Sequence, residues 1–247
     1  MIAFLTSSPA IPKDAEHPYS AREVNGANGL IDRLAALWKP EMNVLFISAA
    51  PAEHEENLPR AAELGAAFAV SGLPFAGLTV WDGAGPGYAP QALRRFDLLI
   101  LAGGHVPTQN AFFRRIGLRE KLAGYPGIVL GISAGTMNSA DVVYAQPELE
   151  GEALDPDYRR FLPGLGLTEA MVLPHYQAVR HAALDGMRLF EDITYRDSVG
   201  RVFYALVDGS YLLVQNGVTT LYGEGYRIAD GRLLKICAAG KSVVLPV

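Results

Sequence analysis

The chain has 247 residues, half of them hydrophobic, and a formal charge of −5 at pH 7. Its acidic and basic residues are interspersed, with neither the basic stripe that follows a nucleic-acid backbone nor an apolar run long enough to cross a membrane. A single cysteine excludes an internal disulfide, and residues 1–6 lack the basic start and cleavage site of a signal peptide. We therefore expect one cytoplasmic α/β domain, residues 1–247, with neither nucleic acid nor membrane as a partner.

The first half of the chain predicts strands that alternate with helices. Short apolar runs indicate strands at residues 2–6, 43–49, 75–81, 97–102 and 125–130. Helices are expected at residues 55–71, 89–95 and 108–123, and after Asn28, which would cap a helix that ends before Pro40. A polar segment at residues 7–27 is long for a connection and is expected to shelter a site. Since most connections are short, the pattern favours a three-layer, doubly wound and largely parallel sheet.

The second half is less regular. Residues 144–158 are acidic and contain proline, which is typical of a surface excursion, and they are followed by an expected strand at 171–176 and a helix at 180–196. Short strands then follow at residues 202–206, 211–214, 219–222, 226–228 and 233–236, separated by Asp208-Gly209, Asn216-Gly217 and Asp230-Gly231. Because these dipeptides favour tight hairpins, we expect an antiparallel C-terminal extension at one edge of the sheet.

Residues 131–135, Gly-Ile-Ser-Ala-Gly, stand between an apolar strand and a helix start. In this context G-x-S-x-G is typical of a nucleophile elbow, a tight turn that presents its serine at the top of a sheet. Ser133 would be the nucleophile, and the N–H of Ala134 would point to where an oxyanion forms. The alternative is a glycine-rich turn whose serine only caps the helix. A second glycine-rich turn, Gly103-Gly104, also follows a strand, and two such turns favour a site.

A serine hydroxyl needs a base within hydrogen-bond reach, and the chain has five histidines. His175 is the preferred base because it ends an apolar strand on the side of the sheet where Ser133 is expected. His105 follows the Gly-Gly turn and is expected to line the site. The other histidines, His17, His54 and His181, are interpreted as surface residues. No histidine occurs after residue 181, which disfavours the α/β-hydrolases, where the order is serine, acid and then a late histidine.

A carboxylate must orient the base and stabilise its imidazolium. Asp208 is preferred because it follows an apolar strand and can be presented at the strand end, although Asp-Gly is also a common plain turn. Asp141, on the helix behind the elbow, is the main rival, and Glu148 and Glu224 are weaker ones.

The second oxyanion donor should come from a neighbouring strand end, and the N–H of Gly104 together with that of Ala134 is the expected pair. Close packing of a helix on a strand is the alternative role for the Gly-Gly turn. The histidines lack the spacing of metal ligands, so neither a metal nor a cofactor is expected. Cys237 is interpreted as a small core residue, and a cysteine-type amidotransferase is excluded because the elbow holds a serine.

Four segments together resemble the peptidase E (aspartyl dipeptidase) and cyanophycinase family of serine peptidases: LILAGGH at 99–105, GISAG at 131–135, LPHY at 173–176 and ALVDGSYLLV at 205–214. The likeness runs from about residue 40 to 225. It implies a glutamine-amidotransferase-like α/β fold with Ser133 as nucleophile and His175 as base. It also implies that Asp208 takes the place of an acidic residue of peptidase E, and that Gly104 and Ala134 form the oxyanion hole.

The chain departs from this family at three points. His105 stands where members often have Asn or Asp, and the acid is an aspartate rather than a glutamate. Peptidase E reads an N-terminal aspartate with an arginine in the loop after its histidine. That loop differs here, so Arg180 or Arg188 would have to take this role.

The sequence therefore predicts a serine peptidase that cleaves short peptides, most simply a dipeptidase. A cyanophycinase-like or other amide hydrolase on the same triad is the second hypothesis, and a binding module without turnover is the third. The expected partner is a short peptide, with His105 and Arg180 as candidate substrate-binding residues. A monomer and a homodimer are both compatible with the sequence.

Overall fold

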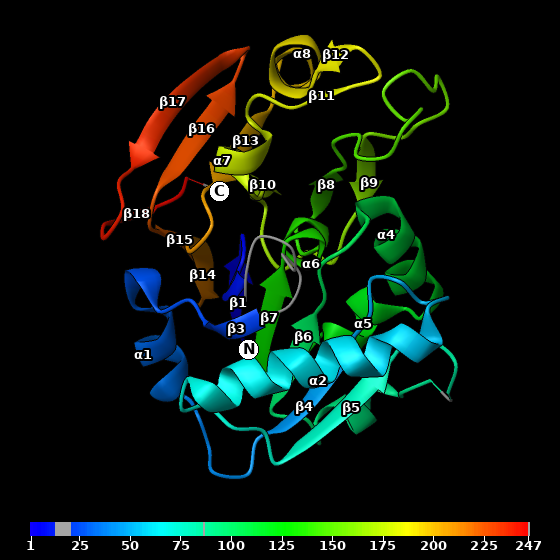
Figure 1. Cartoon of the computed structure of the whole chain (residues 1–247), viewed down its shortest axis with the longest axis vertical. Helices are drawn as coiled ribbons and strands as arrows, with labels where there is room; N and C mark the ends of the chain where they lie inside the picture. The colour runs from blue at the N-terminus through cyan, green and yellow to red at the C-terminus, as the bar shows by residue number, and fades with distance from the viewer. Residues whose placement is uncertain (13–20, 86, 247) are drawn as a thin grey trace.

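An eight-stranded sheet lies at the centre of the computed structural model, which describes residues 1–12, 21–85 and 87–246 (Figure 1). The strand order is β18-β15-β14-β1-β7-β6-β4-β5. In chain order these strands are β1 (Ile2–Thr6), β4 (Asn43–Ile47), β5 (Gly77–Trp81), β6 (Leu98–Leu101), β7 (Ile128–Ile132), β14 (Tyr211–Gln215), β15 (Val218–Tyr222) and β18 (Ser242–Val244).

Five of these strands run parallel and three run antiparallel to their neighbours. β1, β7, β6, β4 and β5 pair in parallel, whereas β14, β15 and β18 add antiparallel strands beyond β1. The predicted α/β class with a mostly parallel central sheet is therefore confirmed. Strands from the C-terminal part of the chain do extend one edge of it.

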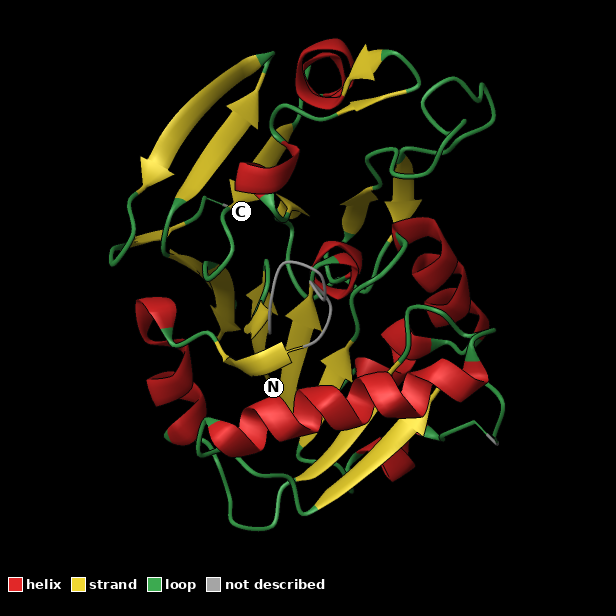
Figure 2. Ribbon diagram, viewed as in Figure 1, coloured by secondary structure: helices red, strands yellow, loops and turns green. Residues whose placement is uncertain are grey.

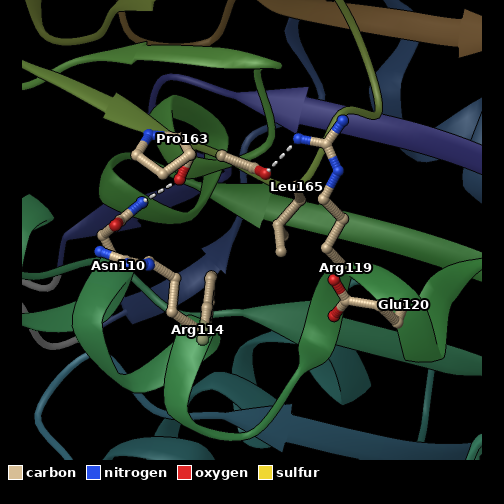
Figure 3. Close-up of a pocket in the computed structure, with 8 residues that line it drawn as sticks. Asn110, Arg114, Arg119, Glu120, Pro163 and Leu165 are labelled. Atoms are coloured by element: carbon tan, nitrogen blue, oxygen red, sulfur yellow. Dashed lines mark hydrogen bonds between the residues drawn. The ribbon is translucent and has the colours of Figure 1, made fainter.

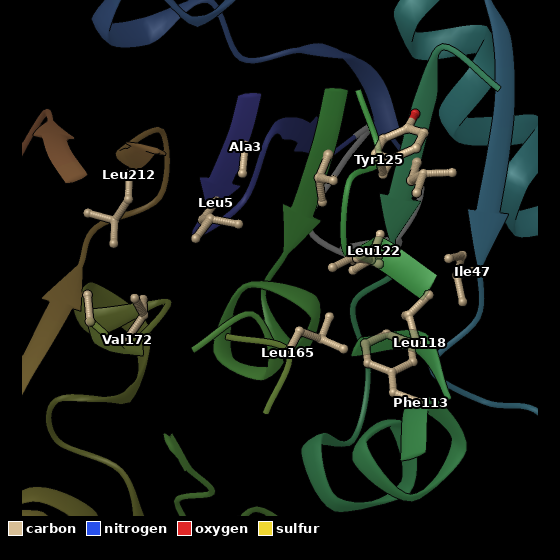
Figure 4. Packing of buried hydrophobic residues seen from close by; sticks show 14 of the residues in the cluster. Ala3, Leu5, Ile47, Phe113, Leu118, Leu122, Tyr125, Leu165, Val172 and Leu212 are labelled. Atoms are coloured by element: carbon tan, nitrogen blue, oxygen red, sulfur yellow. The ribbon is translucent and has the colours of Figure 1, made fainter. Parts of the chain in front are cut away.

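Helices cover both faces of this sheet because side chains alternate along its buried strands. In β6, Leu98 and Ile100 pack in a core with residues of α1 and α2, and Figure 2 shows α2 lying across that face. Leu99 and Leu101 belong to the opposite core with residues of α4 and α5, part of which Figure 4 shows. The helices are α1 (Leu30–Ala35), α2 (His54–Val70), α3 (Pro90–Leu93), α4 (Val106–Arg115), α5 (Leu118–Leu122) and α6 (Ala134–Asn138).

A second sheet was not predicted. It has the order β10-β13-β16-β17 and consists of β10 (Met171–Leu173), β13 (Val202–Leu206), β16 (Gly225–Ala229) and β17 (Arg232–Cys237). The expectation that all the late strands extend the central sheet is thus wrong for β13, β16 and β17. The reason is that β10 and β16 occupy both edges of β13, so β14 pairs with β1 instead.

The three expected hairpin dipeptides behave differently. Asn216-Gly217 joins β14 to β15, and Asp230-Gly231 joins β16 to β17, with positive φ at both residues of each turn. These two are tight hairpins, as predicted. Asp208-Gly209 instead carries the chain from the second sheet to the central one, so its assignment as a hairpin is wrong.

Three helix predictions also need correction. The helix expected at 108–123 is two helices, divided at Gly117, whose φ is 60°. Asn28 caps no helix, because its side-chain amide donates to the carbonyl of Gly209. The helix expected at 180–196 is interrupted because Asp185 and Gly186 both have positive φ and form a turn between two short strands. The elements of this region are α7 (Tyr176–Val179), β11 (Ala183–Leu184), β12 (Met187–Arg188), a π-helical segment η2 (Leu189–Thr194) and α8 (Tyr195–Asp197).

The remaining elements are short. They are β2 (Ala10–Pro12), β3 (Ala21–Val24), η1 (Ala27–Gly29), β8 (Val142–Tyr144) and β9 (Phe161–Pro163). β2 and β3 pair within the long polar segment that was expected to shelter a site, and the part between them, with His17, lies outside the described residues. Within the described ranges, no helix combines the length and the apolar character needed to span a membrane.

Candidate active site

The carboxyl ends of three neighbouring parallel strands meet at one edge of the central sheet. β1 continues into Ser7, β6 into Gly103-Gly104, and β7 into Ser133. The second sheet contributes two more strand ends, because β10 and β13 are also parallel neighbours and lead to His175 and Asp208. Residues far apart in the chain are therefore brought together at the ends of two sheets, which is where α/β proteins bind ligands.

Ser133 occupies a strained turn. Its φ of 49° and ψ of −108° lie outside the regions that non-glycine residues usually adopt. A Cβ on Gly131 would lie 2.9 Å from Oγ1 of Thr136, and a Cβ on Gly135 would lie 2.2 Å from the carbonyl oxygen of Leu101. The two glycines thus allow the tight strand-to-helix turn that the sequence predicted, with the serine at its tip.

Gly135→Ala is expected to lower the free energy of unfolding by about 1–3 kcal/mol or more, because the added Cβ would collide with a backbone carbonyl that cannot rotate away. Thermal unfolding measures the change. Gly85→Ala is the matched control, since a Cβ at Gly85 meets nothing within 4 Å. If the two variants melted at the same temperature, the close approach at the elbow would be wrong.

The side chains of Ser133, His175 and Asp208 form a hydrogen-bonded series. Oγ of Ser133 lies 2.9 Å from Nε2 of His175. Nδ1 of His175 lies 2.7 Å from Oδ1 of Asp208. A carboxylate can only accept, so Nδ1 carries the proton and Nε2 is left as an acceptor for the serine hydroxyl. This is the arrangement that activates a serine as a nucleophile.

Asp208 is held by two residues that the sequence analysis did not single out. The hydroxyl of Ser7 donates to its Oδ1 at 2.7 Å, and the amide of Gln177 donates to its Oδ2 at 2.6 Å. Burial alone raises the pKa of Asp208, but these bonds and the contact with His175 bring the net pKa below its ordinary value. The carboxylate therefore stays ionised well into the acid range. Only the position of Ser7, directly after a parallel strand, could have indicated it.

The Gly103-Gly104 turn lies beside the elbow. A Cβ on Gly103 would be 3.5 Å from Cβ of Ser133, and one on Gly104 would be 2.7 Å from Cβ of Ala49. Gly104 also has a φ of 152°, so a side chain at this position would be both crowded and strained. The turn therefore brings backbone without side-chain obstruction close to Ser133, which leads directly into α6 at Ala134.

His105 is already engaged by neighbours other than the triad. Its Nε2 lies 2.8 Å from Oε1 of Glu152, and its Nδ1 lies 2.8 Å from Oγ1 of Thr108. The other oxygen of Glu152 accepts the backbone N–H groups of Glu148 and Leu149. His105 thus ties the β8–β9 connection to the start of α4, a contact for which the sequence carried no signal.

The rival carboxylates have partners of their own. Asp141 accepts from Arg119 at 2.6 Å, and Arg119 also donates to the carbonyl of Gly164 across the pocket shown in Figure 3. Glu224 pairs with Lys235 at 2.9 Å. Burial raises the pKa of Glu148, and the nearby charges of His105 and His175 act in the opposite direction. Nδ1 of His175, however, is bonded to Asp208 alone among these carboxylates.

The two candidate specificity arginines differ in their surroundings. Arg188 donates twice to Asp192, from Nε at 2.9 Å and from Nη2 at 2.7 Å. Arg180 is exposed, follows α7, and lies close enough to Glu224 to lower the pKa of that carboxyl. Cys237 is buried in the core as predicted, and burial raises the pKa of its thiol.

The fold and these side chains define an α/β protein with a serine, a histidine and an aspartate in series at its strand ends. Two solved structures share this fold over nearly the whole chain. One is a peptidase from an acI-B1 Actinobacterium, with a TM-score of 0.64 and 16% identity over 99% of this chain and 96% of that one. The other is described as a peptidase E protein from Listeria monocytogenes EGD-e, with a TM-score of 0.56 and 15% identity over 96% of this chain and 98% of that one.

No protein-family model and no curated protein matches the chain. At the identities of the two solved structures, the comparison establishes the common fold. What the chain does must be argued from its own residues.

Proposed function

We propose that this chain is a serine peptidase of the peptidase E type, which hydrolyses short peptides through an acyl-enzyme on Ser133. The observation that carries the proposal is the series Ser133–His175–Asp208, with its distances of 2.9 and 2.7 Å. The strained φ of Ser133 and the names of the two solved proteins of this fold support it. A glutamine-amidotransferase-like assignment of the fold belongs to the same proposal.

The proposed chemistry follows from the proton positions. Asp208 accepts a hydrogen bond from Nδ1–H of His175, so Nε2 is free to take the proton of Ser133 as the serine oxygen attacks the scissile carbonyl. The N–H groups of Gly104 and Ala134 would stabilise the oxyanion. His175 then passes its proton to the leaving amine. Water, activated by the same histidine, hydrolyses the acyl-enzyme and restores the serine.

The test is hydrolysis of a dipeptide panel, including Asp-Xaa members, together with longer peptides and other amides. Labelling of Ser133 with a fluorophosphonate probe is measured in parallel. Cleavage of dipeptides with labelling supports the proposal. Labelling with cleavage only of longer or unusual amides would favour a cyanophycinase-like or other amide hydrolase. A folded protein that neither cleaves nor labels would be a binding module, and the proposal would be wrong.

Arg180→Ala is expected to lower kcat/KM for Asp-Xaa relative to Ala-Xaa by about tenfold or more, if an aspartate side chain is read after the histidine as in peptidase E. The reason is that a hydrogen bond to a charged group would be lost. Arg188→Ala is the control, because Arg188 is committed to Asp192 and should leave the ratio unchanged. An unchanged ratio in Arg180→Ala would show that this arginine does not set specificity.

A further inference from the structure

Ser7 contacts both the base and the acid of the proposed triad from inside the protein. It is fully buried at the end of β1. Its Oγ accepts the backbone N–H of His175 at 2.8 Å and lies 2.7 Å from Oδ1 of Asp208. The carbonyl of Leu206 is a more distant acceptor, at 3.4 Å. The hydroxyl of Ser7 has one proton to donate. It accepts from the N–H of His175 and donates its proton to the nearer acceptor, Oδ1 of Asp208.

Gln177 holds the same carboxylate from the solvent side. Its Nε2 donates to Oδ2 of Asp208 at 2.6 Å, and its Oε1 accepts the backbone N–H of Asp208 at 3.1 Å. The second bond decides the orientation of the amide, because a flipped amide would place two donors against each other. The NH2 group of Gln177, and not its carbonyl oxygen, therefore faces the carboxylate of Asp208.

The carboxylate of Asp208 thus receives three donors in fixed directions. Oδ1 accepts from His175 and Ser7, and Oδ2 accepts from Gln177. The acid and the histidine are about one-third exposed, with side-chain exposures of 36% and 35%. Water could therefore compete for the histidine contact if the carboxylate were free to rotate. Asp208 lies on the connection between the two sheets, outside any strand, so hydrogen bonds to its side chain must hold the carboxylate in place.

We propose that Ser7 and Gln177 are positioning residues, which hold the carboxylate of Asp208 in the one orientation where Oδ1 accepts a hydrogen bond from Nδ1–H of His175. The kinetic consequence rests on the proposed peptidase function, but the orientation itself has an independent readout. Ser7 acts through the buried end of β1, and Gln177 through the first turn of α7. The central sheet and the helix that follows the base thereby fix an acid delivered by the second sheet.

Gln177→Met tests the proposal on a residue at the surface, where folding is not at risk, because methionine has similar length and no donor. Its kcat should fall about tenfold to a hundredfold, the equivalent of one hydrogen bond to a charged group, with KM unchanged. The acid limb of the kcat/KM profile should move to higher pH, because a carboxylate that has lost a donor is more basic and stabilises the imidazolium of His175 more strongly. Gln215→Met, at an exposed glutamine of β14, is the matched control. Ser7→Ala should act in the same direction, and Ser7→Thr should restore part of the loss.

A downfield proton NMR signal of His175 Nδ1–H gives the readout that does not need turnover. It should be present in the wild type and Gln215→Met, absent in Asp208→Asn, and shifted or exchange-broadened in Gln177→Met and Ser7→Ala. If both variants kept the wild-type signal and pH profile, the positioning role would be overturned while the peptidase proposal stood. If the wild type neither cleaved nor labelled, the peptidase proposal would fail, and the NMR comparison would still decide the positioning role.

Discussion

Ser133→Ala is expected to lower kcat/KM for the best dipeptide by about 10⁶-fold, as loss of the nucleophile does in subtilisin. The reason is that the hydroxyl bonded to Nε2 of His175 is removed, so neither covalent attack nor the coupled proton transfer can occur. Steady-state hydrolysis measures the loss, and fluorophosphonate labelling should disappear with it. The backbone of the elbow should remain intact, because alanine is smaller than serine and Ser133 caps α6 without a side-chain hydrogen bond.

Ser242→Ala is the matched control for this substitution, since Ser242 is an exposed serine on β18, the antiparallel edge strand, and three strands separate β18 from β7 in the central sheet. It should cleave and label like the wild type. A Ser133→Ala protein that retained activity within tenfold of wild type would place the nucleophile elsewhere and reject the proposed mechanism.

Asp208→Asn is expected to lower kcat by about 10⁴-fold, the loss seen when the triad aspartate of a serine protease becomes asparagine. An amide nitrogen facing Nδ1 would favour the opposite tautomer, in which Nε2 carries the proton and cannot accept the proton of Ser133. The geometry should otherwise persist, because the side chains have nearly the same shape. The measurement is kcat at neutral pH, on protein whose folding is checked by its thermal unfolding.

Asp141→Asn tests which of the two aspartates that the sequence offered as the triad acid has that role. Asp141 is paired with Arg119 on the surface, so its neutralisation should change kcat by less than about twofold and remove at most a weak ion pair. If Asp141→Asn gave the large loss and Asp208→Asn did not, the acid of the proposed triad would be wrongly assigned. Equal small effects would argue against a triad of this kind.

Local patterns were sufficient to predict the parallel strands of the central sheet, but they missed β2 and β3 and the division of the helix expected at 108–123. β1, β6 and β7 are apolar runs bounded by glycine or polar residues, and each lies within two residues of its predicted bounds at its carboxyl end. The G-x-S-x-G turn was also readable, because both glycines are required by close contacts with backbone or Thr136. The contact of Gly131 is local, with Thr136, whereas that of Gly135 is with Leu101 on the neighbouring strand β6; the spacing of the motif nevertheless marks both in the sequence.

Patterns in the second half were ambiguous for a physical reason. A short apolar strand such as β13 fits an edge of the central sheet or a separate sheet equally well, since its own residues do not specify its partner. The interruption at Asp185-Gly186 was missed because the surrounding residues have helical spacing while these two adopt positive φ. The partners of β13 are strands distant in the chain, whereas β11 and β12 pair with each other across the Asp185-Gly186 turn.

The sequence by itself determined the α/β alternation, the elbow at Ser133, and the identity of His175 and Asp208 as candidates, because residue type and spacing carry those signals. Only the tertiary structure decided which carboxylate lies within hydrogen-bond distance of His175. Asp208 reaches it because β13 lies parallel to β10, and that pairing joins residues more than thirty positions apart. The same is true of Ser7, whose contact with Asp208 spans 201 positions of the chain.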